Sequence, residues 1–394
     1  MVAAAVLTEE IHSTSDADLK KTAVENKRAL PTYEEIRSAI PAQCFEKNLP
    51  LSIAYLMWDY AVIGLLYVAV PYVEQYAGWP GLLVWYYVMG MFMSSLFIIG
   101  HDCGHTTFSN YEWVNDICGH LAHAPIMAPY WPWKKSHHQH HSYTGHLEKD
   151  KGHPWVTETD WAEKDWLSRN FCKLPISGLF RRSLVRSSAY HGTRSTRSSD
   201  CPASSYGSHF WPFSPLFTNN KERLQCVVSG AACALCAYLA FTLCNFSIVA
   251  WVKYYYVPLL FQGLWMVMIT YLQHQDEEIE VYEPSTWNFV KGQSQTIDRY
   301  YGFGIDTALH HISDGHVAHH FFFTKIPHYH LPEATKALRE VLSAYPGAYK
   351  QRPCYATLFE FLRLNVKLDY LLGRGTGLLK YRTSKDYADK PKAQ

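Results

Sequence analysis

Apolar residues are concentrated in two long blocks of the chain, residues 53–100 and 224–273. Each block is about twice the ~20 apolar residues that a helix needs to cross a bilayer. The first block contains YAGWPG near its middle, which predicts two helices joined by a tight turn, and the second has a break near Asn245 to Tyr256. The pattern predicts four transmembrane helices, at about 53–76, 79–100, 224–247 and 254–274.

Charge placement decides between membrane spans and pairs of buried helices in a soluble protein. The two blocks carry a single Lys or Arg, Lys253, whereas the N-terminal segment, the region 101–223 and the C-terminal part hold all the others. The positive-inside rule places these three basic regions on the cytosolic side. Asp59 lies between Trp58 and Tyr60, which indicates the membrane interface rather than the hydrocarbon centre.

Composition narrows the function classes further. With 36 Lys and Arg against 35 Asp and Glu, the chain offers no electrostatic case for binding nucleic acid. The first thirty residues have no long apolar core, so no cleavable signal peptide is expected. The ten cysteines do not form a secreted disulfide pattern, and CALC at 233–236 is interpreted as packing inside an apolar helix rather than as a zinc or redox pair.

Three histidine clusters lie just outside the predicted spans, all on the same side of the membrane. They are HDCGH at 101–105, HHQHH at 137–141 and HVAHH at 316–320. Positions i, i+3 and i+4 of a helix share one face, so most histidines within each cluster can converge, whereas His138 falls on another face. The candidate metal ligands are His101, His105, His137, His140, His141, His316, His319 and His320.

The number and type of these side chains indicate the kind of metal centre. Eight converging imidazoles are more than one ion accepts, so two ions are expected, and imidazole suits zinc, copper, iron and nickel. No clustered thiolates accompany them, which argues against a structural zinc finger. Two irons with open coordination positions would suit the activation of O2. The carboxylates placed to orient the ring N–H groups are Asp102, Asp150, Asp306 and Asp314.

The order of the three motifs and their flanking sequences resemble a known family. HDCGH, HHQHH and HVAHH, with two predicted spans between the second and third, look like the three histidine boxes of membrane fatty acid desaturases. The flanking sequences GHLAHAPIMAPYWPWKKSHHQHH, MITYLQHQDEEIEVYE and YGFGIDTALHHISDGHVAHHFFFTKIPHYHLPEAT resemble the methyl-end group, which includes Δ12 and ω3 desaturases. The similarity covers roughly residues 31–182 and 206–350.

The resemblance implies a fold and a complete ligand set. The fold would be an all-α integral membrane protein, in which four transmembrane helices carry a cytosolic helical cap that holds a di-iron site. The eight box histidines would be the iron ligands, and His274 in TYLQH would supply a ninth, with His310 as the reserve candidate. His120 and His123 are instead interpreted as residues that make structural hydrogen bonds.

The resemblance also implies an activity and its partners. The protein would be an O2-dependent fatty acyl desaturase that places a cis double bond toward the methyl end of an unsaturated chain, with Δ12 favoured and ω3 the other position. The acyl carrier would be a phospholipid or coenzyme A. No HPGG haem-binding sequence is present, so electrons would come from separate cytochrome b5 and its NADH-dependent reductase. The C-terminal KPKAQ resembles a dilysine signal for the endoplasmic reticulum membrane, read from the cytosol.

Two other functions stay open on the sequence. An acyl-chain hydroxylase, epoxygenase or acetylenase could use the same histidine scaffold. A histidine-rich membrane metal transporter or sensor belongs to a different class, and it would need polar residues along a path within the membrane. The predicted spans offer almost none.

The predicted domain organisation has three parts. Residues 1–32 form a flexible N-terminal segment, 33–350 the desaturase domain with cap regions 101–223 and 275–350, and 351–394 a cytosolic tail. Residues 183–205 are rich in Ser and Arg where relatives have a shorter, more apolar passage. This composition is typical of a disordered loop, and an altered reading frame or splice difference would produce the same pattern.

Overall fold

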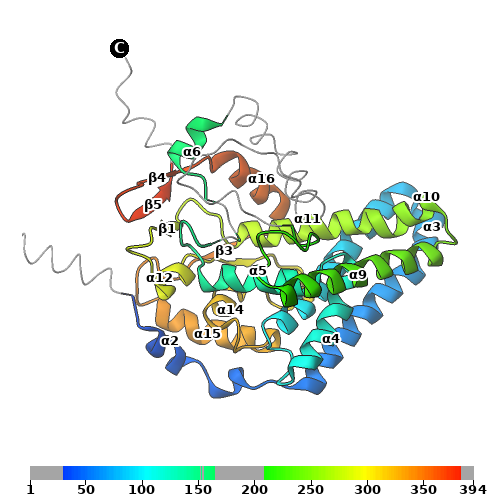
Figure 1. The fold of residues 1–394 in the computed structure, drawn as a ribbon, viewed down its shortest axis with the longest axis horizontal. Helices are drawn as coiled ribbons and strands as arrows, with labels where there is room; N and C mark the ends of the chain where they lie inside the picture. Colours follow the sequence, from blue (N-terminus) through cyan, green and yellow to red (C-terminus); the bar gives the residue numbers. More distant parts are fainter. Residues whose placement is uncertain (1–29, 151, 153–154, 165–207, 383–394) are drawn as a thin grey trace, which may run out of the picture.

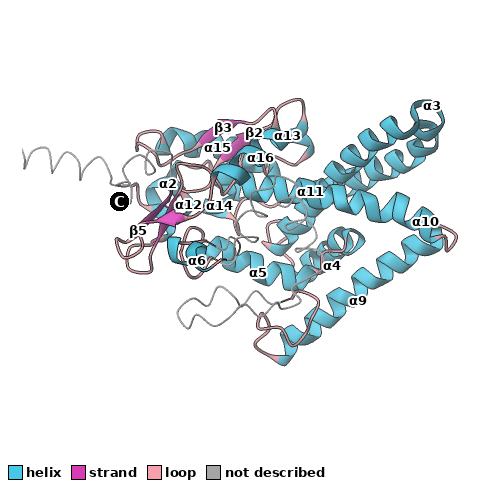
Figure 2. Ribbon diagram, turned by 90° about the horizontal axis from the view of Figure 1, so that it is seen from above, coloured by secondary structure: helices cyan, strands magenta, loops and turns pink. Residues whose placement is uncertain are grey.

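A computed structural model describes residues 30–150, 152, 155–164 and 208–382 of the chain (Figure 1). The predicted flexible N-terminal segment, the Ser- and Arg-rich stretch 183–205 and the KPKAQ sequence lie largely or wholly outside the described residues. Long apolar helices project from one side of the molecule, and the other described residues form a mainly helical body that we call the cap (Figure 2).

The first apolar block forms α3 (Leu49–Gly104), which is a hairpin of two helices. Gly78 leaves helical geometry with φ 56° and ψ −148°, a backbone conformation that costs glycine little. The two halves then run side by side. The Trp85 indole N–H of the second half donates to the Leu66 carbonyl of the first at 2.7 Å. The turn predicted from YAGWPG is confirmed.

The second apolar block also folds back on itself. It forms α9 (Asn220–Leu243), then α10 (Ile248–Trp251), the π-helical turn η4 (Val252–Tyr256) and α11 (Val257–Leu272) in continuous succession. The turn lies at residues 244–247, where Asn245 and Phe246 have positive φ angles. The last apolar helix begins at Ile248, earlier than the predicted residue 254. The Ser247 side chain caps this start by accepting a hydrogen bond from the Ala250 N–H.

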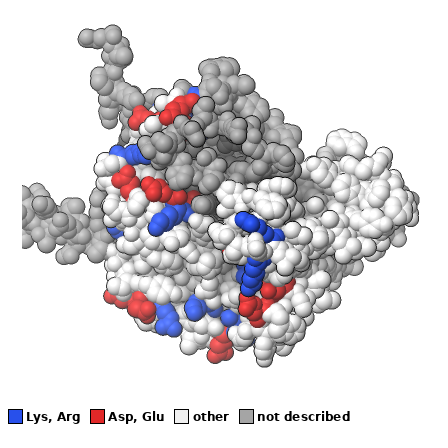
Figure 3. All heavy atoms as spheres, in the orientation of Figure 1, with Lys and Arg blue, Asp and Glu red and all other residues white. Residues whose placement is uncertain are grey.

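The projecting helices have the surface of a membrane protein. Among the described residues, the helical segments α3, α9 and Ile248–Leu272 are long and apolar enough to cross a bilayer. Large apolar side chains on them are bare, including Leu65 at 67% and Leu243 at 84% exposure. On the face shown in Figure 3, charged side chains lie over the cap while the projecting lobe is uncharged. An apolar surface of this extent needs a lipid environment.

Three charged residues within the apolar helices have paired side chains. Lys253, in the turn η4 that follows α10, binds Glu74 at 2.6 Å. Asp59 is fully buried and accepts a 2.8 Å hydrogen bond from His310 of the cap. The Asp59 carboxylate therefore lies inside the protein, against the cap, and its predicted depth at the membrane interface stays a prediction.

The cap consists of short helices and two small sheets. One antiparallel sheet has the order β1 (Glu280–Tyr282), β5 (Leu378–Tyr381), β4 (Leu371–Leu372), and β2 (Asp298–Tyr300) pairs in parallel with β3 (Gln351–Pro353). The fold is therefore mostly helical rather than wholly helical as predicted. The helices are α2 (Tyr33–Ala39), η1 (Ala42–Phe45), α4 (Glu112–His123), η2 (Ala124–Ile126), α5 (Tyr130–Ser142), α6 (Glu158–Glu163), α12 (Phe289–Gln293), α13 (Ile305–Ala308), α14 (His316–Phe322), η5 (His328–His330), α15 (Leu331–Leu342) and α16 (Thr357–Lys367).

The segment predicted as a C-terminal tail is part of this body up to its last described residue. β3 and β5, both beyond residue 350, pair with strands that precede it. Phe361 of α16 is buried against Tyr271 of α11, with ring centroids 5.3 Å apart. These contacts attach residues 351–382 to the rest of the cap and to the base of the last apolar helix.

Close packing of α3 against α11 brings the histidine-bearing ends of the apolar helices together. Gly90 touches the α11 backbone so closely that an added Cβ would lie 2.6 Å from the carbonyl carbon of Phe261. The Trp265 indole N–H donates to the Tyr87 carbonyl at 3.0 Å. His101 near the end of α3 and His274 just after α11 consequently reach the same region of the cap.

Candidate metal centre

The structure gathers nine histidines from four parts of the chain at the junction of the apolar helices and the cap. They come from the end of α3, from α5, from the residue after Gln273 and from α14. Most of these rings are buried, as expected of side chains that face one another across packed helices. They divide into two groups by the distances between their ring nitrogens.

Five histidines form the first group. One ring nitrogen from each lies within 4.8 Å of those from all the others. The Nε2 of His141 lies 3.0 Å from that of His137 and 3.2 Å from that of His319. The full group is His101, His105, His137, His141 and His319.

Four histidines form the second group, and they include the one that follows α11. Ring nitrogens of His140, His274 and His320 lie within 4.8 Å of one another. The Nε2 of His274 is 3.3 Å from that of His140 and 3.0 Å from that of His316. Neighbouring histidines of one helix therefore belong to different groups. On α5, His141 faces the first group and His140 faces the second.

The distances between donor atoms fit metal coordination. Ligands about 2.0–2.1 Å from one ion lie roughly 3.0–3.4 Å apart at octahedral to tetrahedral angles, and the four nitrogen–nitrogen distances given above fall in this range. Among the described residues, the Nε2 of His320 and both ring nitrogens of His105 are buried without a hydrogen-bond partner. In a neutral imidazole one ring nitrogen carries a hydrogen and the other a lone pair, and a buried lone pair without a donor suits a metal ion, so the donor set fits two ions.

The environment keeps these imidazoles in the form that binds metals. Burial is the main cause that holds the pKa of His137, His141 and His319 well below the usual value, and repulsion from neighbouring imidazoles adds to it. The same two causes lower the pKa of His316 and His320. A neutral ring offers a lone pair, so the site is prepared for cations at neutral pH.

Two of the four carboxylates named from the sequence contact the histidines. Asp150 lies 2.7 Å from Nδ1 of His140, and its own position is set by the Gly145 N–H, which donates to it at 3.0 Å. Asp102 lies 3.5 Å from Nδ1 of His101. A carboxylate on Nδ1 leaves Nε2 to point at an ion, which is the arrangement that orients metal-binding histidines.

The other two carboxylates and the reserve ligand lie in different contacts. Asp306 accepts from the backbone N–H groups of Tyr301 and Gly302, and Asp314 pairs with His311 at 3.1 Å. His310 contacts Asp59, as described above, whereas His274 belongs to the second group. Proximity in sequence to the third box therefore did not place Asp306 or Asp314 against the clustered rings.

Three further residues hold the cluster in place, and the sequence analysis did not identify them. Gln293 is fully buried and bridges two groups, since its Oε1 lies 3.0 Å from Nδ1 of His320 and its Nε2 donates to the His141 carbonyl at 2.8 Å. Thr144 lies 3.2 Å from the same Nδ1. His328 is buried and contacts Asp102 at 2.9 Å. A single Gln or Thr belongs to no recognisable sequence motif, so no pattern in the sequence pointed to Gln293 or Thr144.

Three other histidines, His138, His120 and His123, behave as their sequence positions indicated. His138 is exposed and its ring packs 5.3 Å from Phe323, on a different face of α5 from the cluster. His120 contacts the Ser229 hydroxyl at 3.0 Å, and His123 the Phe97 carbonyl at 3.1 Å. The prediction of structural hydrogen bonds for His120 and His123 is confirmed.

Replacing Asp150 with Asn is expected to weaken metal binding or activity about 10–100-fold, because the neutral amide no longer fixes the His140 ring. The volume of the side chain is conserved, so the fold should persist. Metal content and product yield at equal protein level measure the effect. Asp314→Asn is the matched control, since Asp314 pairs with His311. Equal behaviour of the two variants would contradict the orienting role of Asp150.

Bare apolar helices and two groups of converging imidazoles define a membrane-associated protein with a histidine-rich candidate metal centre. The model of the fatty acid desaturase family matches residues 77–353. The chain is 54% identical to the Delta(12) fatty acid desaturase fat-2 of Caenorhabditis elegans, over 93% of this chain and 94% of that protein. The chain therefore belongs to the fatty acid desaturase family, as its histidine motifs predicted.

Two further relatives extend the similarity. The omega-3 fatty acid desaturase fat-1 of Caenorhabditis elegans is 46% identical, over 96% of this chain and 91% of that protein. The Delta(12)-acyl-lipid-desaturase of Punica granatum is 34% identical, over 80% of this chain and 81% of that protein. The similarity thus covers most of each chain.

Proposed function

We propose that this desaturase introduces a cis double bond toward the methyl end of an unsaturated acyl chain, with Δ12 as the favoured position and ω3 as the other. The grouping of nine imidazoles into a set of five and a set of four is the observation that carries the proposal. The names of the relatives support the position, since one with 54% identity is a Δ12 enzyme and one with 46% identity an ω3 enzyme.

The two histidine groups would hold two iron ions. His101, His105, His137, His141 and His319 would ligate one, and His140, His274, His316 and His320 the other. Two irons would supply the activation of O2 that an unactivated C–H bond requires, which acid–base side chains do not provide. Asp150 and Asp102 would orient their histidines, and Gln293 would fix the rings where the two groups meet.

The protein's own residues contribute position and exclusion of water. The rings of Trp133 and Phe323 pack on the cluster, with Trp133 stacked 4.5 Å from His137 and Phe323 stacked 4.7 Å from His141. Such apolar walls favour a hydrocarbon chain over water beside the reacting methylenes. The depth to which an acyl chain enters before its end or an existing double bond stops it would set the position of the new bond.

The proposed setting is the endoplasmic reticulum membrane. The two halves of α3, with α9 and Ile248–Leu272, would make four crossings, so that both termini, the cap and the iron site lie on the cytosolic side. The basic residues outside the apolar helices support this orientation. Cytochrome b5 and its NADH-dependent reductase would deliver the electrons, and the acyl chain would be carried by a phospholipid or coenzyme A.

Expression in a yeast that lacks polyunsaturated lipids tests this function. The expected result is a new diene from endogenous oleoyl chains, and mass spectrometry of derivatised fatty acids would place the new bond at Δ12. A triene from fed diene would indicate ω3 activity as well. Products that retain oxygen would indicate the hydroxylase or epoxygenase alternative. Normal protein levels with no new fatty acid would contradict the proposal.

A further inference from the structure

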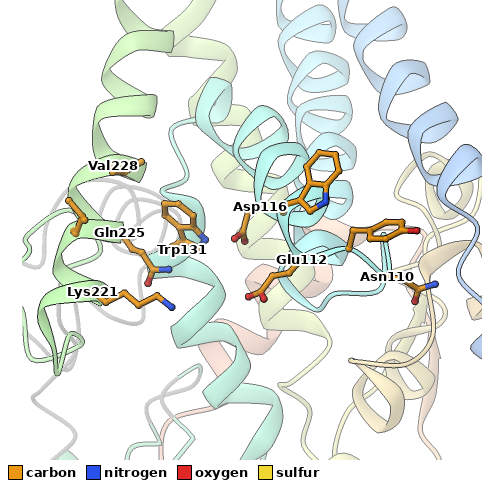
Figure 4. Close-up of a pocket in the computed structure, with 10 residues that line it drawn as sticks. Asn110, Glu112, Asp116, Trp131, Lys221, Gln225 and Val228 are labelled. Atoms are coloured by element: carbon orange, nitrogen blue, oxygen red, sulfur yellow. The ribbon is translucent and has the colours of Figure 1, made fainter.

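A pocket of about 770 Å³ lies between α4, α5 and α9, apart from the histidine cluster. Its volume is in the range of small-molecule sites. Figure 4 shows the carboxylates of Glu112 and Asp116 on one side and the side chains of Lys221 and Gln225 on the other, directed into the same space. Trp131 stands between them, and the full lining adds Asn110, Tyr111, Trp113, Leu224 and Val228.

The pocket opens where the apolar surface of the molecule meets the cap. Trp113, Ile117 and Leu121 are exposed at i, i+4 and i+8 of α4, so one face of this helix is bare and apolar. On α9, Leu224 and Val228 are exposed at the first turns of a helix long enough to cross a bilayer. Polar groups beneath such a rim lie at the depth of lipid headgroups.

The charges in the pocket suit a ligand with both signs. Glu112 and Asp116 stand one turn apart on α4, opposite the single ammonium of Lys221. Asp116 is also 3.4 Å from Lys134, whose charge partly offsets it. With Lys134 included, two carboxylates balance two ammonium groups, which leaves no excess of positive charge for a polyanion such as coenzyme A, which needs clustered Lys or Arg.

Aromatic rings strengthen the side of the pocket that favours a cation. Tyr111, Trp113 and Trp131 contribute to the lining beside the two carboxylates. The face of an indole attracts ammonium groups, and quaternary ammonium is bound in proteins by such aromatic walls. The lysine and the Gln225 amide on the opposite side offer donors for a phosphate.

We propose that this pocket binds the headgroup of a zwitterionic phospholipid, with the phosphate at Lys221 and Gln225 and the ammonium at Glu112, Asp116 and the aromatic rings. The inference rests on the proposed function, because it identifies the carrier of the acyl chain. Trp131 and His137 are six residues apart on α5, about 9 Å along the helix axis. A lipid held here would extend its acyl chain toward the histidine cluster.

A change of charge at one exposed position tests the pocket directly. Glu112→Lys leaves one carboxylate against two ammonium groups on the lining, and it changes a side chain that is exposed at the first turn of α4. The purified iron-loaded protein, in nonionic detergent, would be exposed to equimolar dihexanoyl phosphatidylcholine and dihexanoyl phosphatidylglycerol. Native mass spectrometry would measure the ratio of the two bound lipids.

The wild-type protein is expected to prefer phosphatidylcholine, and Glu112→Lys is expected to lower the ratio about tenfold toward phosphatidylglycerol. Glu340→Lys is the matched control, since Glu340 is exposed on α15, which packs on α2 and α14. It should keep the wild-type ratio. Absence of a preference in the wild type, or equal shifts in the two variants, would overturn the proposal.

The yeast assay separates this inference from the proposed function. If the wild type makes dienes but Glu112→Lys binds both lipids as the wild type does, the headgroup site is wrong and the activity stands. If the wild type makes no new fatty acid while the lipid ratio responds to Glu112→Lys alone, the pocket stands as a lipid site and the proposed function is wrong.

Discussion

Replacing His319 with Ala is expected to abolish desaturation, with product yield lowered more than about 100-fold. His319 belongs to the group of five, where its Nε2 lies 3.2 Å from that of His141 and its ring 4.5 Å from that of His101. Its removal takes one donor from the interior of the site. The purified variant should lose one of the two irons and keep the other, because the group of four is intact.

The matched control for this change lies in the second histidine motif. His138→Ala removes an imidazole that is exposed and directed away from the cluster. It should retain iron content and most of the activity. Metal analysis of both proteins, with diene yield in yeast at equal protein level, distinguishes them. Full iron content in His319→Ala would contradict its place as a ligand.

Replacing His274 with Ala is expected to have an effect as large as that of His319→Ala, on the other ion. The Nε2 of His274 lies 3.0 Å from that of His316 and 3.3 Å from that of His140, so this residue is central to the group of four. Loss of one iron and of diene formation is the expected outcome, measured by metal analysis and product yield.

His310→Ala provides the informative comparison for His274. His310 pairs with buried Asp59, so its loss leaves a buried carboxylate without this partner and should cost about 3–5 kcal/mol of stability. The midpoint temperature of thermal unfolding should fall in this variant, while the protein that stays folded should keep both irons. Loss of iron from folded His310→Ala, with full iron in His274→Ala, would reverse the assignment of the ninth ligand.

Local patterns in the sequence predicted the parts of the structure that depend on local physics. The helical repeat decides which histidines of HHQHH share a face, and the structure places His138 away from the other three. Gly78, the first glycine of YAGWPG, marks the turn of α3 because a glycine backbone enters that conformation at little cost.

Contacts between distant residues could not be predicted in this way. Asp59 and His310 are 251 positions apart, and Gln293 meets His141 across 152 positions. Asp306 is near the third histidine motif in sequence, yet it accepts hydrogen bonds from backbone N–H groups in a turn. Any carboxylate beside a loop with positive φ angles could do the same. The three-residue strands of the cap carry too little alternation to be recognised.

The metal content of the purified protein decides whether the two histidine groups hold two iron ions. The protein would be purified from iron-supplemented cells, analysed for iron and zinc, and examined by Mössbauer spectroscopy after growth on enriched iron. Two irons per chain are expected, with one lost in His319→Ala and one in His274→Ala. A single ion per chain, zinc in place of iron, or iron that persists in both variants would contradict this expectation.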